Sequence, residues 1–422
     1  MKYKSFSEIF RKYVQRHNVV DLMPVEELNS AGIFVVIPAF LEREYIERCL
    51  LSLIEADGIA TKVCVIVVVN ASEDASSEII KEQEELFQQV VEFSLNNSSS
   101  QLIITPLKVF NVKKKHFGVG YARKAGMDQA VLQLYNSNRL NAVIVSLDAD
   151  SIVAPNYFNE IERYFNDDDN MGCSIRFEHP LEGDLNPGVY EAIAQYELHM
   201  RYYKFALLQT GFPYAFHTVG SSFALKASQY VRAGGMPRKQ AGEDFYFIQK
   251  VVQMGGYGEL NTTCVYPSAR SSTRVPFGTG PSVRKMVEDK SEYTTYNLVA
   301  FHYLKKFFET RMSLYGVSQE EFNIYVDTLP EILKDFLIRD NFFDDIVNLS
   351  NNCASQEVFD RRFFELFNAF KVVKYLNYVH DNTLKKVPVT KAAMQLLDEM
   401  NLEIPEFTNA KKLLEIFREI DG

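Results

Sequence analysis

A short apolar run that ends in two carboxylates constrains the fold of this chain more than any other stretch. Ala142–Leu147 has the length and the branched side chains of a buried parallel strand, and Asp148-Ala-Asp150 follows it directly. Ligands of open α/β sheets bind beyond the carboxyl ends of the strands. Alternate residues of an extended segment share a face, so Asp148 and Asp150 can point into one site. Their oxygens suit a divalent ion that keeps positions for phosphate, although Asp-x-Asp also occurs in solvated loops.

Apolar runs and segments of helical periodicity alternate through the first 150 residues. We expect strands at Ile33–Ile37, Val63–Val69, Leu102–Ile104, Lys108–Asn111 and Ala142–Leu147, with helices between most of them. We expect the first strand to stop at Pro38, because proline has no N–H to donate to the ladder. This alternation predicts right-handed βαβ units and a doubly wound, mostly parallel sheet flanked by helices.

The pattern changes in the second half of the chain. Beyond Asp150 we expect strands at Cys173–Glu178 and Ser221–Leu225, and a helix that begins at Gly242-Glu-Asp. From Lys285 on, aromatic-rich helical periodicity continues without a strand candidate. The sequence therefore predicts a helical leader over residues 1–30, an α/β domain over 31–284 and an all-helical C-terminal domain over 285–422.

Composition excludes several classes of protein. The net charge of −10 argues against nucleic acid as a partner. The five cysteines have no paired spacing, which argues against a disulfide framework or a zinc site. The chain lacks an uninterrupted apolar run of roughly 20 residues and an N-terminal signal peptide. We therefore expect a cytoplasmic protein without a transmembrane segment, and peripheral association with the inner face of a membrane stays open.

Polar motifs follow the predicted strands in a definite order. Pro38-Ala-Phe-Leu-Glu42 follows the first strand and Asn70 the second, while Gly118–Gly126 begins a helix that bears Arg123 and Lys124. Asp148-Ala-Asp and Gly242-Glu-Asp come later. In this order and spacing, the stretch Ile33–Pro281 resembles a family 2 glycosyltransferase of the GT-A (Rossmann-like) fold. Such enzymes move a sugar from a nucleotide-diphosphate donor to an acceptor.

The resemblance implies a nucleoside pocket beyond the first two strands. Pro38, Ala39 and Glu42 would line it, and Asn70 would contact the base, with an amide that suits uracil or guanine equally. The sequence departs from the family at Leu41, where asparagine is usual, and at Val69-Asn-Ala-Ser, where the family has Asp-Asp-Gly-Ser. Ordinary turn chemistry explains Asn70 equally well.

The resemblance also implies residues that bind the diphosphate. Arg123 and Lys124 follow Gly118 and Gly120, glycines that allow a ligand to approach the backbone closely. A dinucleotide-binding fingerprint is excluded, because Arg123 occupies its third glycine position. A solvated helix face remains an alternative for Lys124.

The acidic motifs supply the implied chemistry. Asp150 would bind Mn²⁺ or Mg²⁺, and Asp148 would assist through the ribose or a metal-bound water. Asp244 would be the general base that deprotonates the acceptor hydroxyl. Glu243 and Asp244 are alternatively ordinary first-turn acids of a helix.

A loop rich in glycine and hydroxyl residues, Tyr266–Gly280, carries two more candidate cations. Arg270 and Arg274 would contact the donor diphosphate, with a purely structural loop as the alternative. The sequence contains no histidine between His217 and His302, so we name no third metal ligand.

The leading hypothesis is an inverting, metal-dependent glycosyltransferase with a nucleotide-diphosphate sugar as donor. A catalytically weak nucleotide-sugar-binding or scaffold protein is the alternative, because Leu41 and Val69 depart from the family. A sugar-nucleotide pyrophosphorylase is less favoured, since the glycine-rich signature of that group is missing after the first strand. Neither the donor sugar nor the acceptor follows from the sequence.

Overall fold

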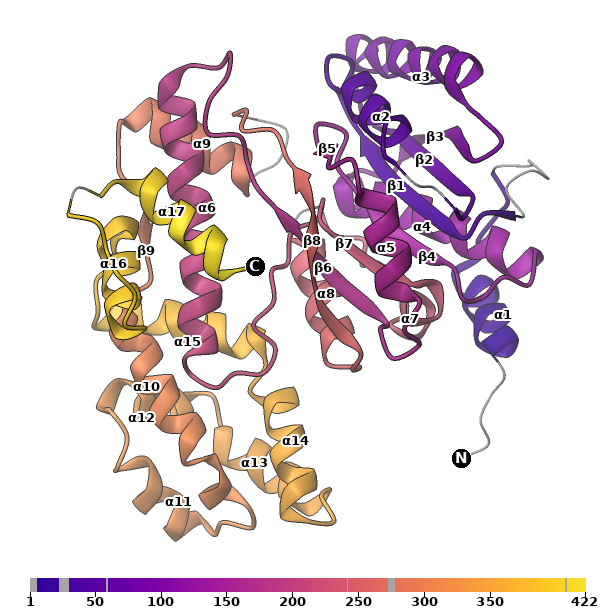
Figure 1. Cartoon of the computed structure of the whole chain (residues 1–422). Helices are drawn as coiled ribbons and strands as arrows, with labels where there is room; N and C mark the ends of the chain where they lie inside the picture. Colours follow the sequence, from indigo (N-terminus) through magenta and orange to yellow (C-terminus); the bar gives the residue numbers. More distant parts are fainter. Residues whose placement is uncertain (1–5, 23–29, 58–59, 241, 272–277, 407) are drawn as a thin grey trace. The chain divides into compact units, whose positions relative to one another are not determined.

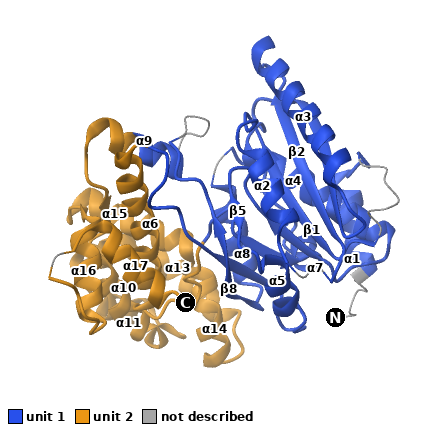
Figure 2. Cartoon of the chain, turned by 45° about the horizontal axis from the view of Figure 1, so that its top comes forward, with its two compact units in different colours: residues 1–185, 218–284 blue, residues 186–217, 285–422 orange. Residues whose placement is uncertain are grey.

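The computed structural model describes residues 6–22, 30–57, 60–240, 242–271, 278–406 and 408–422 (Figure 1). The chain forms two compact units (Figure 2). Unit 1 contains residues 1–185 and 218–284, and unit 2 contains residues 186–217 and 285–422. We describe each unit by itself.

Unit 1 is built on an eight-stranded sheet with the order β3-β2-β1-β4-β7-β6-β8-β5. Its strands are β1 (Ile33–Ala39), β2 (Val63–Ser72), β3 (Leu102–Val112), β4 (Val143–Ser146), β5 (Ile152–Val153), β6 (Gly172–Phe177), β7 (Phe223–Lys226) and β8 (Tyr257–Tyr266). Strands β1 to β4 are parallel, and β8 is parallel to β6. Strand β7 is antiparallel to β4 and β6, and β5 is antiparallel to β8. The predicted mostly parallel sheet is confirmed.

Helices cover the central strands. Those of unit 1 are α1 (Phe6–His17), α2 (Ile46–Ile54), α3 (Ser77–Asn97), α4 (Val119–Asn136), α5 (Tyr157–Phe165), α7 (Ala227–Arg232) and α8 (Glu243–Val252), while α9 (Thr279–Asp289) crosses the unit boundary. The connections through α2 (from β1 to β2) and α3 (from β2 to β3) move across the sheet in one direction. The connection through α4, from β3 to β4, moves back in the other direction. Right-handed crossovers therefore place α4 on the opposite face. A Cβ built on Gly126 of α4 would lie 2.5 Å from Val36 and 2.8 Å from Val68, so this helix packs tightly on β1 and β2.

The first strand does not stop at Pro38, as predicted, but continues to Ala39. The Val36 carbonyl faces β4, because it accepts the N–H of Leu147. Pro38 lies two residues further on and faces the same side, where the ladder with β4 has already ended at Val36. The missing N–H of proline therefore leaves no ladder bond unmade, and the strand can include it.

Other element boundaries also differ from the expectation. The two weak strand candidates after Leu102 form one continuous strand, β3. Strand β8, which we did not expect, contains a polar centre, Asn261-Thr-Thr, and this masks its alternation. Helix α2 begins at Ile46, and Leu41, in the segment before it, has a left-handed backbone with φ of 58°.

Unit 2 is almost wholly helical. Its elements are α6 (Pro187–Leu208), β9 (Thr294–Thr295), α10 (Leu298–Glu309), the 3₁₀ helix η2 (Arg311–Leu314), α11 (Gln319–Val326), α12 (Glu331–Arg339), α13 (Phe342–Asn351), α14 (Gln356–Leu366), α15 (Ala369–Asn382), β10 (Val387–Pro388), α16 (Val389–Glu399) and α17 (Ala410–Ile420). Phenylalanines form much of its core, with Phe307, Phe363 and Phe367 in mutual ring contact. The expectation of no strands is wrong in one detail, because β9 and β10 form a two-residue antiparallel ladder.

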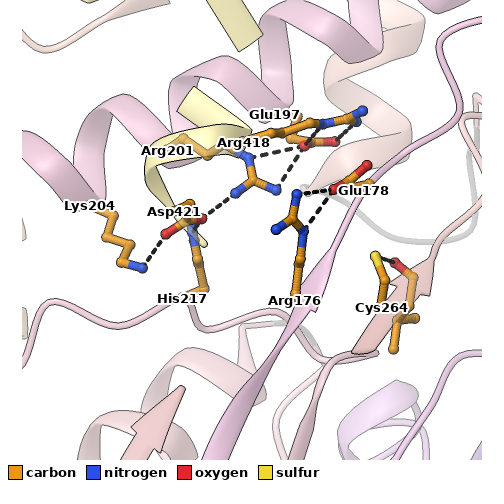
Figure 3. Close-up of polar contacts among 10 residues, drawn as sticks. Arg176, Glu178, Glu197, Arg201, Lys204, His217, Cys264, Arg418 and Asp421 are labelled. Atoms are coloured by element: carbon orange, nitrogen blue, oxygen red, sulfur yellow. Dashed lines mark hydrogen bonds and ion pairs between the residues drawn. The ribbon is translucent and has the colours of Figure 1, made fainter. Parts of the chain in front are cut away.

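A buried ionic network ties α6 to the last residues of the chain (Figure 3). The carboxylate of Glu197 accepts hydrogen bonds from Arg418 Nε at 2.8 Å and Arg418 Nη2 at 2.9 Å, and from Arg201 Nε at 3.1 Å. Asp421 accepts hydrogen bonds from Arg201 and Lys204. These contacts explain why residues 186–217 group with unit 2. The domain boundaries drawn from the sequence stay a prediction.

Among the described residues, no helix combines the length and the apolar character that a bilayer crossing requires.

Candidate active site

The carboxyl ends of β1, β2 and β4 meet at one edge of the sheet in unit 1. From β1 the chain proceeds to β2 on one side, whereas β4 pairs with β1 on the other. Such a change of direction opens the crevice in which α/β proteins bind ligands. The acidic motif follows β4 at this point, in a tight turn in which the Ser151 N–H donates to the Asp148 carbonyl at 3.0 Å.

A buried arginine joins two of the acidic motifs. The guanidinium of Arg123, on α4, donates through Nη2 to Asp148 and through Nη1 to Glu243, the first residue of α8. The Arg123 side chain is only 4% exposed. Nearby carboxylates keep its pKa above the ordinary value even though burial acts in the opposite direction. Arg123 therefore fixes the turn after β4 against the start of α8.

Three glycines make room for this bridge. A Cβ on Gly220 would lie 2.6–2.8 Å from the Arg123 guanidinium, and one on Gly120 would lie 2.8 Å from the Glu243 side chain. A Cβ on Gly118 would lie 2.9 Å from the backbone of Gln240. Gly118 and Gly120 thus allow α4 to pack against the segment before α8, whereas the sequence suggested that they admit a ligand.

Asp244 lies next to this bridge, at the start of α8. The helix follows Gly242, whose φ of 69° favours glycine. Burial and the negative charge of Asp148 raise the Asp244 pKa, while Arg123 and the Phe245 and Gly220 amides oppose the shift. The Phe245 N–H donates to Asp244 Oδ1 at 2.7 Å. Burial also raises the pKa of the neighbouring Glu243 to about 7. Three carboxylates surround one guanidinium here, so a proton is held among them more readily than in water.

Asp150 and Glu42 share a second arginine. Arg270 Nε donates to Asp150 Oδ2 at 2.8 Å, and Nη2 lies in an ion pair 2.8 Å from the same oxygen. Arg270 Nη2 donates to the Glu42 carboxylate at 2.6 and 2.8 Å. The centroid of the Tyr45 ring lies 3.9 Å from the Arg270 Cζ. The structure therefore brings three predicted site residues, Glu42, Asp150 and Arg270, into direct contact.

A buried thiol lies close to both acidic groups. Burial raises the pKa of Cys49 well above its ordinary value, and the charges of Asp150, Asp148 and Glu42 add to the effect. The Cys49 thiol also contacts the Asp148 carbonyl at 3.6 Å. Cys49 on α2 therefore packs against the turn that carries Asp148.

Gln83, on α3, connects the ends of β1 and β2. Its amide donates to the Asn70 carbonyl at 2.8 Å and the Ala39 carbonyl at 3.3 Å, and it accepts the Leu41 N–H at 2.9 Å. Asn70 is buried, and Pro38 and Ala39 lie at the end of β1. Sequence reasoning missed Gln83, whose only signal is a polar residue at a buried position of an amphipathic helix.

Lys124 belongs to a different cluster. Its Nζ lies 2.9 Å from Asp128 Oδ2 and 3.0 Å from the Tyr13 hydroxyl, and the Tyr230 hydroxyl donates to Asp128 at 2.9 Å. This cluster joins α1, α4 and α7, so the structure does not bring Lys124 to the acidic motifs. Arg274, the remaining predicted residue, lies outside the described residues.

The acidic residues match one type of cation site. Among the described residues, no group of three or more histidine, cysteine or acidic side chains is arranged to hold a metal ion. Asp148 and Asp150 offer hard oxygens from two carboxylates. That number suits Mg²⁺ or Mn²⁺ bound partly by the protein and partly by phosphate oxygens.

Unit 1 thus combines a mostly parallel sheet with acidic motifs at its carboxyl edge. Residues 34–230 match the model of the family described as glycosyl transferase family 2. The match covers somewhat less than half of the chain and supports a glycosyltransferase domain within unit 1.

Solved structures of glycosyltransferases resemble the chain distantly. TarS 1–349 from S. aureus, in complex with UDP-GlcNAc, has a TM-score of 0.41 and 13% identity, with 79% of this chain and 92% of that chain covered. The mannosyltransferase PcManGT from Pyrobaculum calidifontis, in complex with GDP-Man and Mn²⁺, has a TM-score of 0.35 and 12% identity, with 99% and 98% covered. GalNAc-T7 with UDP, GalNAc and Mn²⁺ has a TM-score of 0.36 and 15% identity, with 82% and 58% covered. No curated protein matches the chain significantly.

Proposed function

We propose that unit 1 transfers a sugar from a nucleotide-diphosphate donor to an acceptor hydroxyl by a single, inverting displacement that depends on a divalent metal. The observation that supports this most directly is the Arg123 bridge. It joins the acidic turn after β4 to the helix that carries Asp244. A donor phosphate site and a general base would then lie within the reach of one sugar nucleotide.

Asp244 is the general base of this proposal. It would take the proton of the acceptor hydroxyl as that oxygen attacks the anomeric carbon, while the nucleotide leaves from the opposite face. A general base works best when its pKa lies near the working pH. The raised pKa of Asp244 is therefore suited to the task.

Asp148 and Asp150 are the residues that would hold the metal, and Asp148 would also reach the ribose. When bound, the ion would neutralise charge on the leaving diphosphate. Pro38, Ala39, Glu42 and Asn70 would form the nucleoside pocket. The Asn70 amide suits uracil and guanine, so both UDP and GDP donors belong in the test.

A thermal-shift screen of UDP- and GDP-sugars, with and without Mn²⁺, tests donor binding. A donor at about 100 times its Kd is expected to raise the free energy of unfolding by about 2.7 kcal/mol, because it binds only the folded state. The shift should require Mn²⁺ and should disappear in Asp150→Ala. If every sugar nucleotide stabilised the protein equally with metal and with chelator, the metal-dependent proposal would be wrong.

The stereochemistry of the transfer can be measured separately, at the anomeric carbon of the released sugar. The sugar that is released first from the donor can be assigned as the α or β anomer by proton NMR before it mutarotates. We expect the anomer opposite to that of the donor, since a single displacement inverts the carbon. Retention would exclude Asp244 as the base of a one-step transfer.

The pH profile tests the acidic pair at the start of α8. Donor turnover should rise with pH along an acid limb above the ordinary aspartate range, because the base acts ionised and its pKa is raised. Glu243→Gln removes a neighbouring negative charge, which lowers the cost of ionising Asp244. The acid limb should therefore move to lower pH.

Glu178→Gln provides the control. Glu178 directly follows β6 and pairs with Arg176 on that strand. Its acid limb should coincide with that of the wild type. An acid limb that stays in place in Glu243→Gln would show that the two carboxylates do not titrate together.

A further inference from the structure

Arg270 occupies the oxygens that the proposed metal site would use. Its Nε and Nη2 both lie 2.8 Å from one oxygen of Asp150, and Nη2 also lies 2.6 Å from Glu42. The Tyr45 ring covers one face of the guanidinium. The Arg270 side chain is only 12% exposed, so these contacts enclose a charge that water largely cannot reach.

Two cations cannot use these oxygens at once. Mg²⁺ binds a carboxylate oxygen at about 2.0–2.1 Å, along the lone pairs of that oxygen. Asp150 Oδ2 already accepts the Nε N–H of Arg270 and lies 2.8 Å from Nη2. Like charges also repel strongly at such separations where burial limits screening. A metal that binds Asp150 through this oxygen must therefore displace the guanidinium.

We propose that Arg270 is a resident cation of the active site and that a divalent metal binds Asp150 Oδ2 only by exchange with it. This inference rests on the proposed function, since it concerns the same metal site. It adds that the chain sets its own metal affinity: Arg270 neutralises Glu42 and Asp150 in the metal-free protein and competes with the entering ion.

The exchange assigns Glu42 and Tyr45 a part in metal binding. Glu42 accepts two of the contacts that hold Arg270 in place, and Tyr45 adds a cation–π contact. Arg270 lies outside residues 34–230, the part of the chain that matches the family model. The resident cation is therefore a feature that the family match does not supply.

Binding of Mn²⁺ alone, without donor, tests the exchange. The hexaaqua Mn²⁺ signal in electron paramagnetic resonance measures the free ion, so no activity is required. Arg270→Gln is expected to bind Mn²⁺ roughly tenfold more tightly than the wild type, because the ion no longer displaces a bound charge. Arg270→Lys keeps the charge and should stay within about threefold of the wild type. Arg270→Gln with Asp150→Asn should lose the added affinity.

Arg311→Gln is the matched control. Arg311 in unit 2 also pairs with a carboxylate, Asp360, at 2.7 Å and lies over an aromatic ring, that of Phe364. This variant changes the net charge equally and should leave Mn²⁺ affinity unchanged. A similar gain in Arg311→Gln would reduce the effect to net charge and overturn the proposal.

A second measurement separates competition from loss of structure. Without metal, Arg270→Gln should melt at a lower temperature than the wild type, since Glu42 and Asp150 then repel each other, and Mn²⁺ should restore the difference. Equal or weaker Mn²⁺ binding by folded Arg270→Gln would overturn the exchange. It would leave the proposed transferase intact, because donor binding by the wild type is scored separately. If no sugar nucleotide bound, the proposed function would fail instead.

Discussion

Asp244→Asn is expected to lower donor turnover by about 100- to 10,000-fold, the range that general-base catalysis contributes. The asparagine side chain has nearly the same shape and can still accept the Phe245 N–H that Asp244 accepts at 2.7 Å. It cannot take a proton from an attacking hydroxyl. Metal-dependent hydrolysis of the donor measures the loss, so the acceptor need not be known.

The companion measurement is donor affinity. Because Asp244 is proposed to act on the acceptor side, the donor-induced thermal shift should change little in Asp244→Asn. Asp150→Ala should show the opposite pattern and lose the metal-dependent shift itself. If Asp244→Asn retained turnover within threefold of the wild type, the acid would be an ordinary first-turn residue of α8, and the base would have to lie elsewhere.

The sequence predicted the parts of the fold that depend on local pattern. The apolar runs that became β1, β2 and β4 are buried along their length. Because the ends of parallel strands share an edge, the pattern of strands is enough to place Asp148 and Asp150 there. The match to the family model was predictable for the same reason, since the motifs follow the strands in a fixed order.

Contacts between distant segments were not predictable. Arg123, Asp148 and Glu243 are far apart in the chain, and nothing in their spacing indicates that one guanidinium joins the two acids. Lys124 directly follows Arg123 but faces Asp128, because α1 packs on that side of α4. Periodicity identifies an apolar face, but it does not show which cation lies under a neighbouring helix.

Partners that come late in the sequence could not be read from the local pattern either. The boundaries predicted from the sequence place the long helix α6 in the α/β domain, and in the structure its Glu197 pairs with Arg418 near the end of the chain. Arg270 was expected to contact a ligand, whereas its described contacts are with Asp150, Glu42 and Tyr45. Charge singled out Arg270 in the sequence but could not identify its partners.

Arg123→Met is expected to cause the largest loss of stability, about 3–5 kcal/mol, because it leaves Asp148 and the buried Glu243 without their shared cation. Chemical denaturation measures the loss. The stability of Arg123→Lys should lie between those of Arg123→Met and the wild type. A single ammonium group cannot bridge two carboxylates as the planar guanidinium does. The control is Arg311→Met, whose pair with Asp360 is more exposed and should cost at most about 1 kcal/mol.

Gly220→Ala disturbs the same bridge from the opposite side, because its new Cβ would lie within 2.8 Å of the Arg123 guanidinium. If the bridge orients the base, folded Gly220→Ala should alter the acid limb of the pH profile as well as stability, since Asp244 depends on both Arg123 and the Gly220 amide. A variant that lost stability but kept the wild-type profile would assign Arg123 to folding alone. The acidic turn after β4 and the base on α8 would then be held together by the sheet and not by this arginine.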